Sequence, residues 1–391
     1  MVLHAEQERA AARAGSKALI REINEALVLD VVRRRGVTSR AEITAVTGLS
    51  PATVTGITGQ LVGDRLLIES DVLRGTGGRP ARLLELGRDA VVAAGVRLAR
   101  DSVEATLVDL RGDVIARYRS ALSSTDPDVA ADAVVAAVAA VRAEKPQSRL
   151  RGVSIALSGI VDRARGTVRH SGSLGWRDVP FAALVAQRSG LRVLIDSLVN
   201  SFATGLLLLD EQLAHRDALV FNVGISLGVS VLVEGRIHRG FAGSAGGFAH
   251  SALGVRDASR PCHCGDVGCL ETWSSLWGMS AERERRGLRT SDPVDAGPDD
   301  VLQEGGERLG VAVANAAKMF APERVVLVLA ADVFDSPFAV SCEDAIEREF
   351  LHGETSAPQI TFVPADSDVF ARGAGYDMIT ELFAVDGRDA V

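Results

Sequence analysis

The amino-acid sequence predicts a mixed α/β protein in which a small winged helix-turn-helix head precedes a much larger body. Residues 16–88 contain three helical patterns and then two strand patterns around a glycine-rich turn, which is the order of a winged helix-turn-helix. The chain has 391 residues, too many for one ordinary hydrophobic core. We expect a tail at residues 1–15, the head at 16–88, and a body at 89–391 with a metal-binding loop at 250–271.

The composition is that of a soluble globular protein, because 47% of the residues are hydrophobic and 24% are charged. The N-terminus has early acidic residues and no continuous apolar stretch, so it does not resemble a signal peptide. No run of about 18 apolar residues occurs, so we expect no membrane-spanning helix and a cytoplasmic protein.

The net charge of −8 is unevenly distributed along the chain. Residues 1–88 hold 13 basic and 10 acidic side chains, whereas the remainder has a net charge of −11. A mildly basic head on an acidic body fits a local DNA-binding module, although an excess of this size also occurs in ordinary domains.

The first helix of the head is indicated by apolar residues at helical spacing, which are Ile20, Ile23, Leu27 and Val31. We expect this helix to end before Gly36, because glycine is a good C-terminal stop.

A second, shorter helix is predicted by a capping box at residues 39–42. In this motif the Ser39 hydroxyl and the Glu42 carboxylate each accept a hydrogen bond from a free backbone N–H at the helix start. Ile43 and Val46 follow at the spacing of one helical face, so we expect both to be buried. Gly48 ends this helix after barely two turns.

Ser50 and Pro51 open a third helix, because serine is a strong N-cap and proline suits the first helical position. Its predicted buried stripe consists of Val54, Ile57 and Leu61. The second and third helices, joined at residues 48–49, make a helix-turn-helix in which the third is the recognition helix.

The outward face of the recognition helix is small and nearly uncharged. Gly56 and Gly59 each cost about 1 kcal/mol relative to alanine, which makes sense if the backbone must approach another surface, such as the floor of a DNA major groove. Alanine and threonine can contact thymine methyls, and glutamine can pair with adenine. The alternative is a short helix packed against another protein domain. The predicted DNA-contacting residues are Arg40, Ser50, Ala52, Thr53, Thr55, Gly56, Gln60 and Arg79.

Two strands are predicted at residues 66–69 and 81–86, on either side of a glycine-rich turn at residues 74–80. Arg79 lies in this turn beside the recognition helix, where an arginine can enter a minor groove. The alternative is a plain hairpin with a solvated arginine.

A metal site is predicted because Cys262, Cys264 and Cys269 fall within eight residues, in a chain without export signals. With His250 they supply three thiolates and one imidazole for a tetrahedral zinc ion, and the intervening glycines let the loop turn the sulfurs toward one point. An iron–sulfur fragment and free thiols are the alternatives. His263 could replace His250, but its place between two ligating cysteines strains the geometry.

These residues resemble a motif of the ROK family (repressors, open reading frames and sugar kinases). The motif is a histidine followed by CxCGxxGCxE. The sequence resembles this family over nearly its whole length, and the head resembles the winged helix-turn-helix of its repressor branch. Residues 153–162 resemble the family's strand ending in PGxVD, residues 174–176 its L-GW, and residues 245–250 its AGExGH. The resemblance implies an actin/hexokinase-like fold of two α/β lobes around a cleft, with a ribonuclease-H-like core in each.

Four segments depart from the pattern of the family's kinases. Residues 97–101 have side chains where the DxGxT phosphate loop has glycines, and residues 224–230 keep half the glycines of the second phosphate loop. Residues 326–330 read VLVLA in place of IVLGG near the adenosine site. Leu198 stands where the ENDAN segment supplies an aspartate base, and losing such a base typically removes about 10²–10⁴ in rate. The resemblance therefore implies that kinase activity is lost and that the protein is not an enzyme.

The family's sugar-binding residues are only partly kept. Ser173 stands where the family has a hydroxyl-binding asparagine, and Gly247 where it has the glutamate of ExGH. The resemblance implies an effector site at Ser173, Asn200, His250 and Glu271. A modified or phosphorylated sugar, another small molecule, or no ligand at all fits these residues.

The leading hypothesis is a repressor of carbohydrate-related genes, controlled by a sugar-like effector and containing Zn²⁺. It would bind a pseudo-palindromic double-stranded DNA operator as a homodimer or dimer of dimers, because one helix-turn-helix reads only a half-site. The alternatives are an ATP-dependent sugar kinase with a regulatory head, and an interaction protein whose head has ceased to bind DNA.

Overall fold

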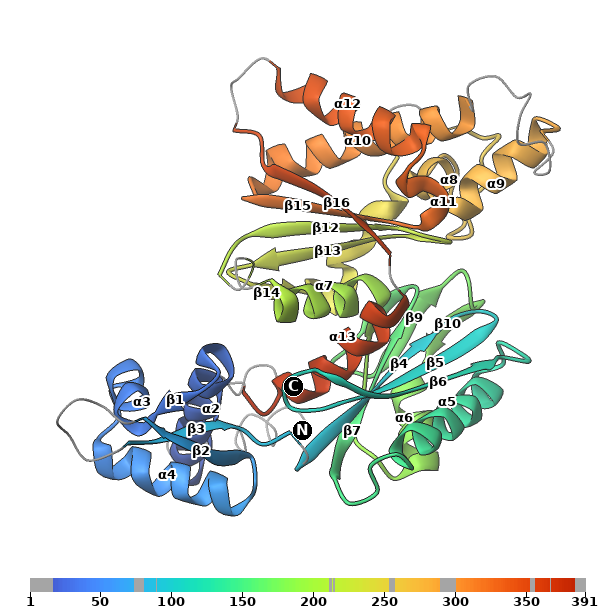
Figure 1. Cartoon of the computed structure of the whole chain (residues 1–391). Helices are drawn as coiled ribbons and strands as arrows, with labels where there is room; N and C mark the ends of the chain where they lie inside the picture. Colours follow the sequence, from blue (N-terminus) through green and yellow to red (C-terminus); the bar gives the residue numbers. More distant parts are fainter. Residues whose placement is uncertain are drawn as a thin grey trace, which may run out of the picture.

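A computed structural model describes residues 17–73, 81–88, 90–210, 213, 215–252, 257–288, 300–351, 356–365 and 367–383. Figure 1 shows a head beside a body of two lobes, with α7 and α13 between the two large sheets. The mixed α/β fold confirms the predicted class. The tail at residues 1–15 and the wing turn with Arg79 lie outside the described residues. Among the helices that are described, none is long and apolar enough to cross a bilayer.

The head begins with three helices, α2 (Lys17–Arg35), α3 (Arg40–Thr47) and α4 (Pro51–Gly63). The predicted capping box is confirmed, because the Ser39 hydroxyl accepts from the Glu42 N–H at 3.2 Å and the Glu42 carboxylate accepts from the Ser39 N–H at 2.7 Å. Gly48 ends α3 with a φ of 70°, a left-handed conformation that glycine adopts without strain. Ser50 caps α4 by accepting from the Thr53 N–H at 3.1 Å.

The buried face of α3 is smaller than predicted. Ile43 is fully buried, but Val46 is 48% exposed, so the prediction that both face inward is wrong for Val46. The helix has only eight residues, and the small core around Ile43 does not extend to its second turn. The predicted stripe of α4 is confirmed, since Val54, Ile57 and Leu61 are all buried.

A three-stranded antiparallel sheet completes the head, in the order β1-β3-β2. The two predicted strands correspond to β2 (Leu67–Leu73) and β3 (Ala81–Leu86). The additional strand β1 (Thr38–Ser39) has two residues, too few for an alternating pattern to reveal it.

The first lobe of the body is built on a five-stranded sheet in the order β11-β7-β4-β5-β6. The central strand β4 pairs antiparallel with β5 and parallel with β7. Helices α5 (Pro127–Arg142) and α6 (Phe181–Ser189) pack against this sheet. The strands are β4 Val91–Leu98, β5 Ser102–Val108, β6 Val114–Ala121, β7 Arg149–Leu157 and β11 Val193–Ser197.

The second lobe repeats this strand arrangement in the order β14-β13-β12-β15-β16. Its central strand β12 likewise pairs antiparallel with β13 and parallel with β15. The repeat is the ribonuclease-H-like pattern that the resemblance implied for each lobe, and it confirms that expectation. The strands are β12 Ala218–Val223, β13 Leu227–Val233, β14 Arg236–His238, β15 Arg324–Leu329 and β16 Gln359–Pro364.

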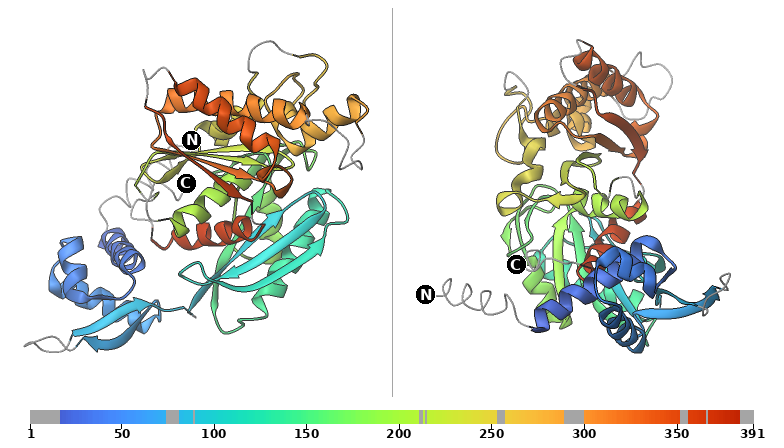
Figure 2. Two further views of the ribbon diagram at one scale, coloured as in Figure 1. Left: turned by 45° about the horizontal axis from the view of Figure 1, so that its top comes forward. Right: turned by 90° about the vertical axis from the view of Figure 1, so that its left-hand side faces the viewer.

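The remaining elements extend the first lobe, lie between the lobes or cover the second sheet, and Figure 2 shows the molecule from two further directions. A small sheet in the order β10-β9-β8 consists of β8 Ile160–Asp162, β9 Thr167–Ser171 and β10 Trp176–Val179. The helices are α7 Leu198–Leu209, the 3₁₀ segment η2 Phe241–His250, α8 Glu271–Ser274, α9 Leu276–Arg285, α10 Asp300–Phe320, α11 Ala331–Phe334, α12 Pro337–Phe350 and α13 Ser367–Thr380.

The head and the first lobe share one hydrophobic core. Buried residues of α2, such as Val28 and Val32, belong to the same cluster as Val91 of β4 and Tyr376 of α13. Burial of each large apolar side chain contributes about 1.5–3 kcal/mol. The head is therefore packed on α13 rather than joined to the body by a linker alone.

Candidate functional site

The two lobes enclose a cavity that brings together all four predicted effector residues, Ser173, Asn200, His250 and Glu271. They come from four segments: the loop after β9, the first turn of α7, the end of η2 and the start of α8. The positions where the family pattern is lost, Leu198 and Gly247, line the same cavity. Among the described residues, no neighbouring atom lies within 4 Å of the place where a Cβ on Gly247 would stand, so these neighbours do not require glycine there.

Asn200 is fixed by the start of α7. Ser197 is the N-cap of this helix, and its hydroxyl accepts from the Asn200 N–H at 3.3 Å. The Asn200 side-chain amide donates to Asp196 Oδ1 at 2.7 Å. Asp196 is buried and also accepts from Arg239 Nε at 2.8 Å, so this neighbouring carboxylate is already paired. Leu198, which begins α7, has no group that accepts a proton.

Glu271 is a buried carboxylate with partners on both of its oxygens. Oε1 accepts from the Leu227 N–H at 3.4 Å, and Oε2 lies 2.9 Å from His263 Nε2. This bond with Glu271 raises the pKa of His263. The His263 ring also packs against Trp277, with 4.7 Å between ring centroids. His263 is therefore turned toward the cavity and Glu271.

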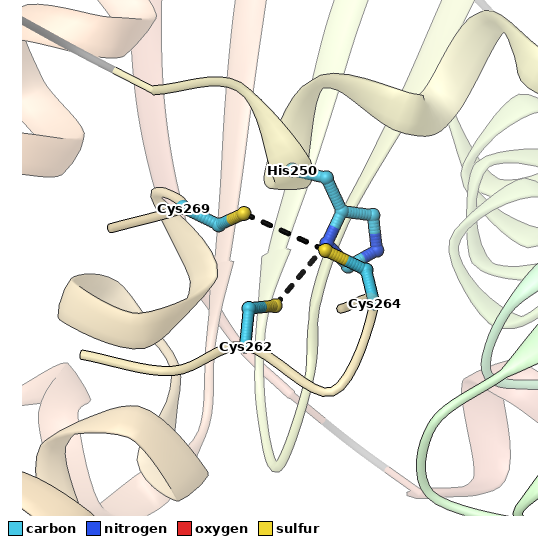
Figure 3. Close-up of side chains that lie close together, drawn as sticks. All are labelled: His250, Cys262, Cys264 and Cys269. Atoms are coloured by element: carbon cyan, nitrogen blue, oxygen red, sulfur yellow. Dashed lines mark hydrogen bonds between the residues drawn. The ribbon is translucent and has the colours of Figure 1, made fainter. Parts of the chain in front are cut away.

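The predicted metal ligands converge, as Figure 3 shows. The ligand atoms of His250, Cys262, Cys264 and Cys269 lie within 4.8 Å of one another. The Cys264 and Cys269 sulfurs are 3.7 Å apart, and the Cys262 sulfur is 3.6 Å from His250 Nδ1. Tetrahedral zinc, with bonds of ~2.3 Å to sulfur and ~2.0–2.1 Å to nitrogen, requires separations of about 3.8 Å and 3.6 Å. The four residues fit a tetrahedral metal ion.

Backbone turns shape the metal-binding loop. The Cys262 N–H donates to the Asp266 carbonyl at 2.8 Å, and the Gly268 N–H donates to the Arg260 carbonyl at 2.9 Å. Gly265 and Gly268 have φ values of 98° and 68°, a region where other residues are strained. These glycines permit the tight turns that direct three sulfurs to one point.

The protonation states of the ligands depend on whether a cation is present, because a metal binds the thiolate form of cysteine. Burial raises the pKa of Cys269 to about 11 and also raises the pKa of Cys262, so without a cation both thiols are protonated near neutral pH. Burial lowers the pKa of His250, which favours the neutral imidazole that binds metals. A second cluster of His250, His263 and Glu271 also has metal-binding groups within 4.8 Å. In that second cluster, His263 Nε2 and Glu271 Oε2 already contact each other directly.

The segment that resembles the first phosphate loop forms a tight hairpin between β4 and β5. The Ala99 N–H donates to the Ser102 carbonyl at 2.9 Å. Arg97 at the end of β4 forms an ion pair of 3.1 Å with Glu104, directly opposite on β5. The segment that resembles the family's first phosphate loop is therefore a tight hairpin flanked by a pair of opposite charges.

On the head, the candidate DNA-contacting residues that are described all lie on or beside α4. Ala52, Thr55, Gly56 and Gly59 are exposed, as predicted. In the part of the chain that the structure describes, no atom outside the local helix backbone lies within 4 Å of a Cβ built on Gly56 or Gly59, so packing against these residues does not explain the two glycines.

Four other candidates, Arg40, Ser50, Thr53 and Gln60, have partners within the head. Arg40 donates to Thr58 Oγ1 at 2.9 Å and pairs with Glu69 at 2.9 Å. Gln60 accepts a hydrogen bond from Arg21. The Thr53 hydroxyl lies 2.8 Å from the hydroxyl of Ser50.

Comparison with known proteins identifies the chain's relatives. The profile described as ROK family matches residues 93–375. The chain belongs to the ROK family. It is 27% identical over 363 residues to the xylose repressor of Caldicellulosiruptor bescii, covering 86% of this chain and 90% of that protein. It is 26% identical over 365 residues to the DNA-binding transcriptional dual regulator NagC of Escherichia coli K12, covering 87% and 88%.

Solved structures of ROK proteins share the fold. A ROK family transcriptional regulator, a homologue of the E. coli MLC protein, superimposes with a TM-score of 0.76 at 21% identity, covering 93% of this chain and 97% of its own. The ROK hexokinase from Thermus thermophilus gives a TM-score of 0.63 at 20% identity, covering 74% of this chain and 99% of its own. The regulator thus matches a larger share of this ROK protein than the hexokinase does.

Sequence reasoning missed several residues of the cavity, among them His170, His238 and Arg239. They lie at or just after the ends of short strands, and no motif marks them. The ring of His170 stacks on His263 at 6.2 Å between centroids. The fold brings these residues, which are up to 69 positions apart in the chain, together in the wall of the cavity.

Proposed function

We propose that this ROK protein is a DNA-binding transcriptional repressor of carbohydrate-related genes, with a sugar-like effector bound between its lobes. Two relatives are named xylose repressor and DNA-binding transcriptional dual regulator, and their matches extend over 86–87% of this chain. One observation carries the proposal: the cavity keeps His250 and Glu271 but has Leu198 where a kinase needs a proton acceptor. Such a cavity can bind a ligand without phosphorylating it.

The proposed arrangement assigns DNA contact to the head at residues 16–88 and effector binding to the body at residues 89–391. The N-terminal part of α4 enters the major groove, since its exposed face has no bulky side chain. The contact residues are those predicted from the sequence, with Arg79 as the minor-groove residue. Two heads in a homodimer read the two halves of a pseudo-palindromic operator.

The metal in this proposal is Zn²⁺, held by His250, Cys262, Cys264 and Cys269. Three sulfurs and one imidazole nitrogen are a ligand set that zinc prefers, and the separations between these atoms suit its bond lengths. The ion has a structural role, because it joins η2 to the loop that leads into Glu271. Its site and the effector site share His250.

An electrophoretic mobility-shift assay tests the repressor function. The full-length protein, at fixed salt concentration, is titrated against DNA from upstream of its own gene and against a shuffled fragment of equal length. We expect selective binding to the upstream DNA, and release by a sugar found by thermal-shift screening. Equal binding to both fragments would contradict the proposal.

A coupled ATPase assay over a panel of sugars tests the competing kinase function. The ROK kinases share the fold, which makes this the relevant alternative. We expect no sugar-dependent turnover, and turnover above background would show that Leu198 is compatible with catalysis.

A further inference from the structure

Four charged residues form a closely spaced cluster between the lobes. Arg163 pairs with Asp377 and lies 3.6 Å from Asp196, while Arg239 lies 2.8 Å from Asp196 and 4.0 Å from Asp377. Both aspartates are buried, and the side chain of Arg163 is 15% exposed. Each carboxylate thus faces both guanidinium groups, and we call these four residues the charge cluster.

The charge cluster joins four separate parts of the fold. Arg163 follows β8 and Asp196 lies on β11, both in the first lobe, whereas Arg239 follows β14 of the second lobe. Asp377 lies on α13, the helix against which the head packs. A movement of one lobe relative to the other must therefore change the distances within this cluster.

One side of the charge cluster faces the effector cavity, and the other faces a groove beside the head. Arg239 lines both of these spaces. On the cavity side, Asn200 donates to Asp196 at 2.7 Å. The groove is also lined by Arg33 and Arg34 of α2.

The contact with the head lies next to Asp377 in the sequence. The Tyr376 hydroxyl accepts from Arg33 of α2 at 3.2 Å, and Arg33 also lies over the ring of Phe383, 5.6 Å from its centroid. Arg34 of the same helix lies 2.9 Å from His215 of the body. A shift of α13 would therefore change the contacts that the last turns of α2 make with it.

Helices α7 and α13 are packed too closely to slide independently. A Cβ on Gly373 of α13 would collide with the backbone carbonyl of Ser201 on α7. A Cβ on Gly205 would lie 3.5 Å from the Cα of Gly373. The helix that begins at the cavity and the helix that holds the head thus meet backbone to backbone.

We infer that the charge cluster is the coupling element of this protein, transmitting the state of the effector cavity through Asp377 and α13 to the head. This inference rests on the proposed function, because it assigns the regulation of that same cavity. A buried carboxylate without a partner is strongly unfavourable. The charge cluster therefore has only a few distinct arrangements, in which each carboxylate is paired. Arg163 is a positioning residue that links Asp196 at the cavity to Asp377 at the head.

Amide hydrogen exchange of the full-length protein tests the coupling without DNA or effector. Asn200→Ala serves as the perturbation at the cavity, and it is made alone and together with Arg163→Gln. We expect Asn200→Ala alone to speed exchange in α13 and in the last turns of α2 by about threefold or more. In the Arg163→Gln background the same substitution should change exchange in α2 by less than about 1.5-fold.

Arg165→Gln is the matched control, because Arg165 is close in sequence, 76% exposed, and outside the charge cluster. With this variant the response of α2 to Asn200→Ala should be retained. Asp377→Asn should remove the response of α2, as Arg163→Gln does. If Asn200→Ala does not fold, Asn200→Ser takes its place as the perturbation. An equal response in all backgrounds, or none in α2 of the otherwise native protein, would overturn the inference. Failure to bind operator DNA would overturn the proposed function but leave these exchange results unaffected.

Discussion

The recognition helix and the effector cavity differ in how the chain builds them. The exposed face of α4 comes from one run of consecutive residues, whereas the cavity collects residues from Ser158 to Glu271 out of both lobes. On α4, glycine and alanine occupy exposed positions, and no neighbouring atom among the described residues explains Gly56 and Gly59. In the cavity, Leu198 and Gly247 stand where the family pattern has carboxylates, while His250 and Glu271 match that pattern and contact each other and His263.

The two regions therefore differ in what their unusual residues do in the proposed function. On α4, small side chains leave a surface that another molecule can approach closely. In the cavity, an apolar side chain and a glycine stand where the family pattern has carboxylates, while the hydrogen bonds of Asn200 and Glu271 hold the walls. The metal-binding loop contributes to the same walls, because it leads into Glu271.

The largest expected effect is that of Cys264→Ser on the metal-binding loop. Loss of one of four ligands should reduce the zinc content from about one ion per chain to near zero and lower Tm by roughly 4 °C or more. Metal analysis and thermal unfolding measure the two effects. Cys342→Ala is the control, because this fully buried cysteine lies in the core of the second lobe and should affect stability without affecting zinc. Unchanged zinc content in Cys264→Ser would remove the metal from the proposal.

The double substitution Gly56→Ala and Gly59→Ala separates stability from function in α4. Each alanine should stabilise the helix by about 1 kcal/mol, because the added methyl meets open space within the chain. The same methyls should weaken operator binding about tenfold or more, by holding the helix away from the groove floor. Unfolding curves and mobility shifts measure these opposite changes.

Gly63→Ala is the matched control for this pair. Gly63 is also exposed, and an added Cβ would again meet open space, but it is the last residue of α4. Its substitution should leave operator affinity unchanged. A loss of affinity equal to that of the double variant would indicate that helix stability, rather than close approach, governs binding.

A smaller effect distinguishes two serines that have the same local role. Ser39 caps α3 and Ser50 caps α4, each through a hydrogen bond from the backbone N–H three residues later. Replacement of either by alanine should cost about 1 kcal/mol of stability. Only Ser50→Ala should also reduce operator affinity measured at a salt concentration where both variants are folded, because Ser50 alone is assigned to the DNA surface. Equal losses of affinity would contradict that assignment.

The head could be predicted closely from the sequence because its signals are local. Capping residues, a proline and two glycines set the helix ends within a few positions, and the backbone hydrogen bonds of these caps involve near neighbours. The prediction for Val46 was wrong because spacing predicts the face of a helix but not how far the neighbouring core extends along it.

The cavity could be predicted only where a family pattern marks its residues. The bond between Arg163 and Asp377 joins positions 214 residues apart, and neither stands in a motif. Arg239 lies 43 residues from its partner Asp196. Buried charges are recognised only when the fold shows their partners, because the same residue types are usually solvated at the surface.

The smallest expected effect is that of Leu198→Asp. This substitution tests most directly what the cavity, in contrast to α4, lacks. This substitution returns a carboxylate to the start of α7, at the wall of the cavity. We expect sugar-dependent ATP turnover to remain at background, because residues 97–101 and 224–230 still depart from the phosphate-loop patterns of the family's kinases. In the proposed function, several independent segments depart from the kinase pattern, and restoring a single general base supplies only about 10²–10⁴ in rate. A coupled assay with the native protein alongside decides the matter, since turnover in the variant alone would mean that Leu198 was the only barrier.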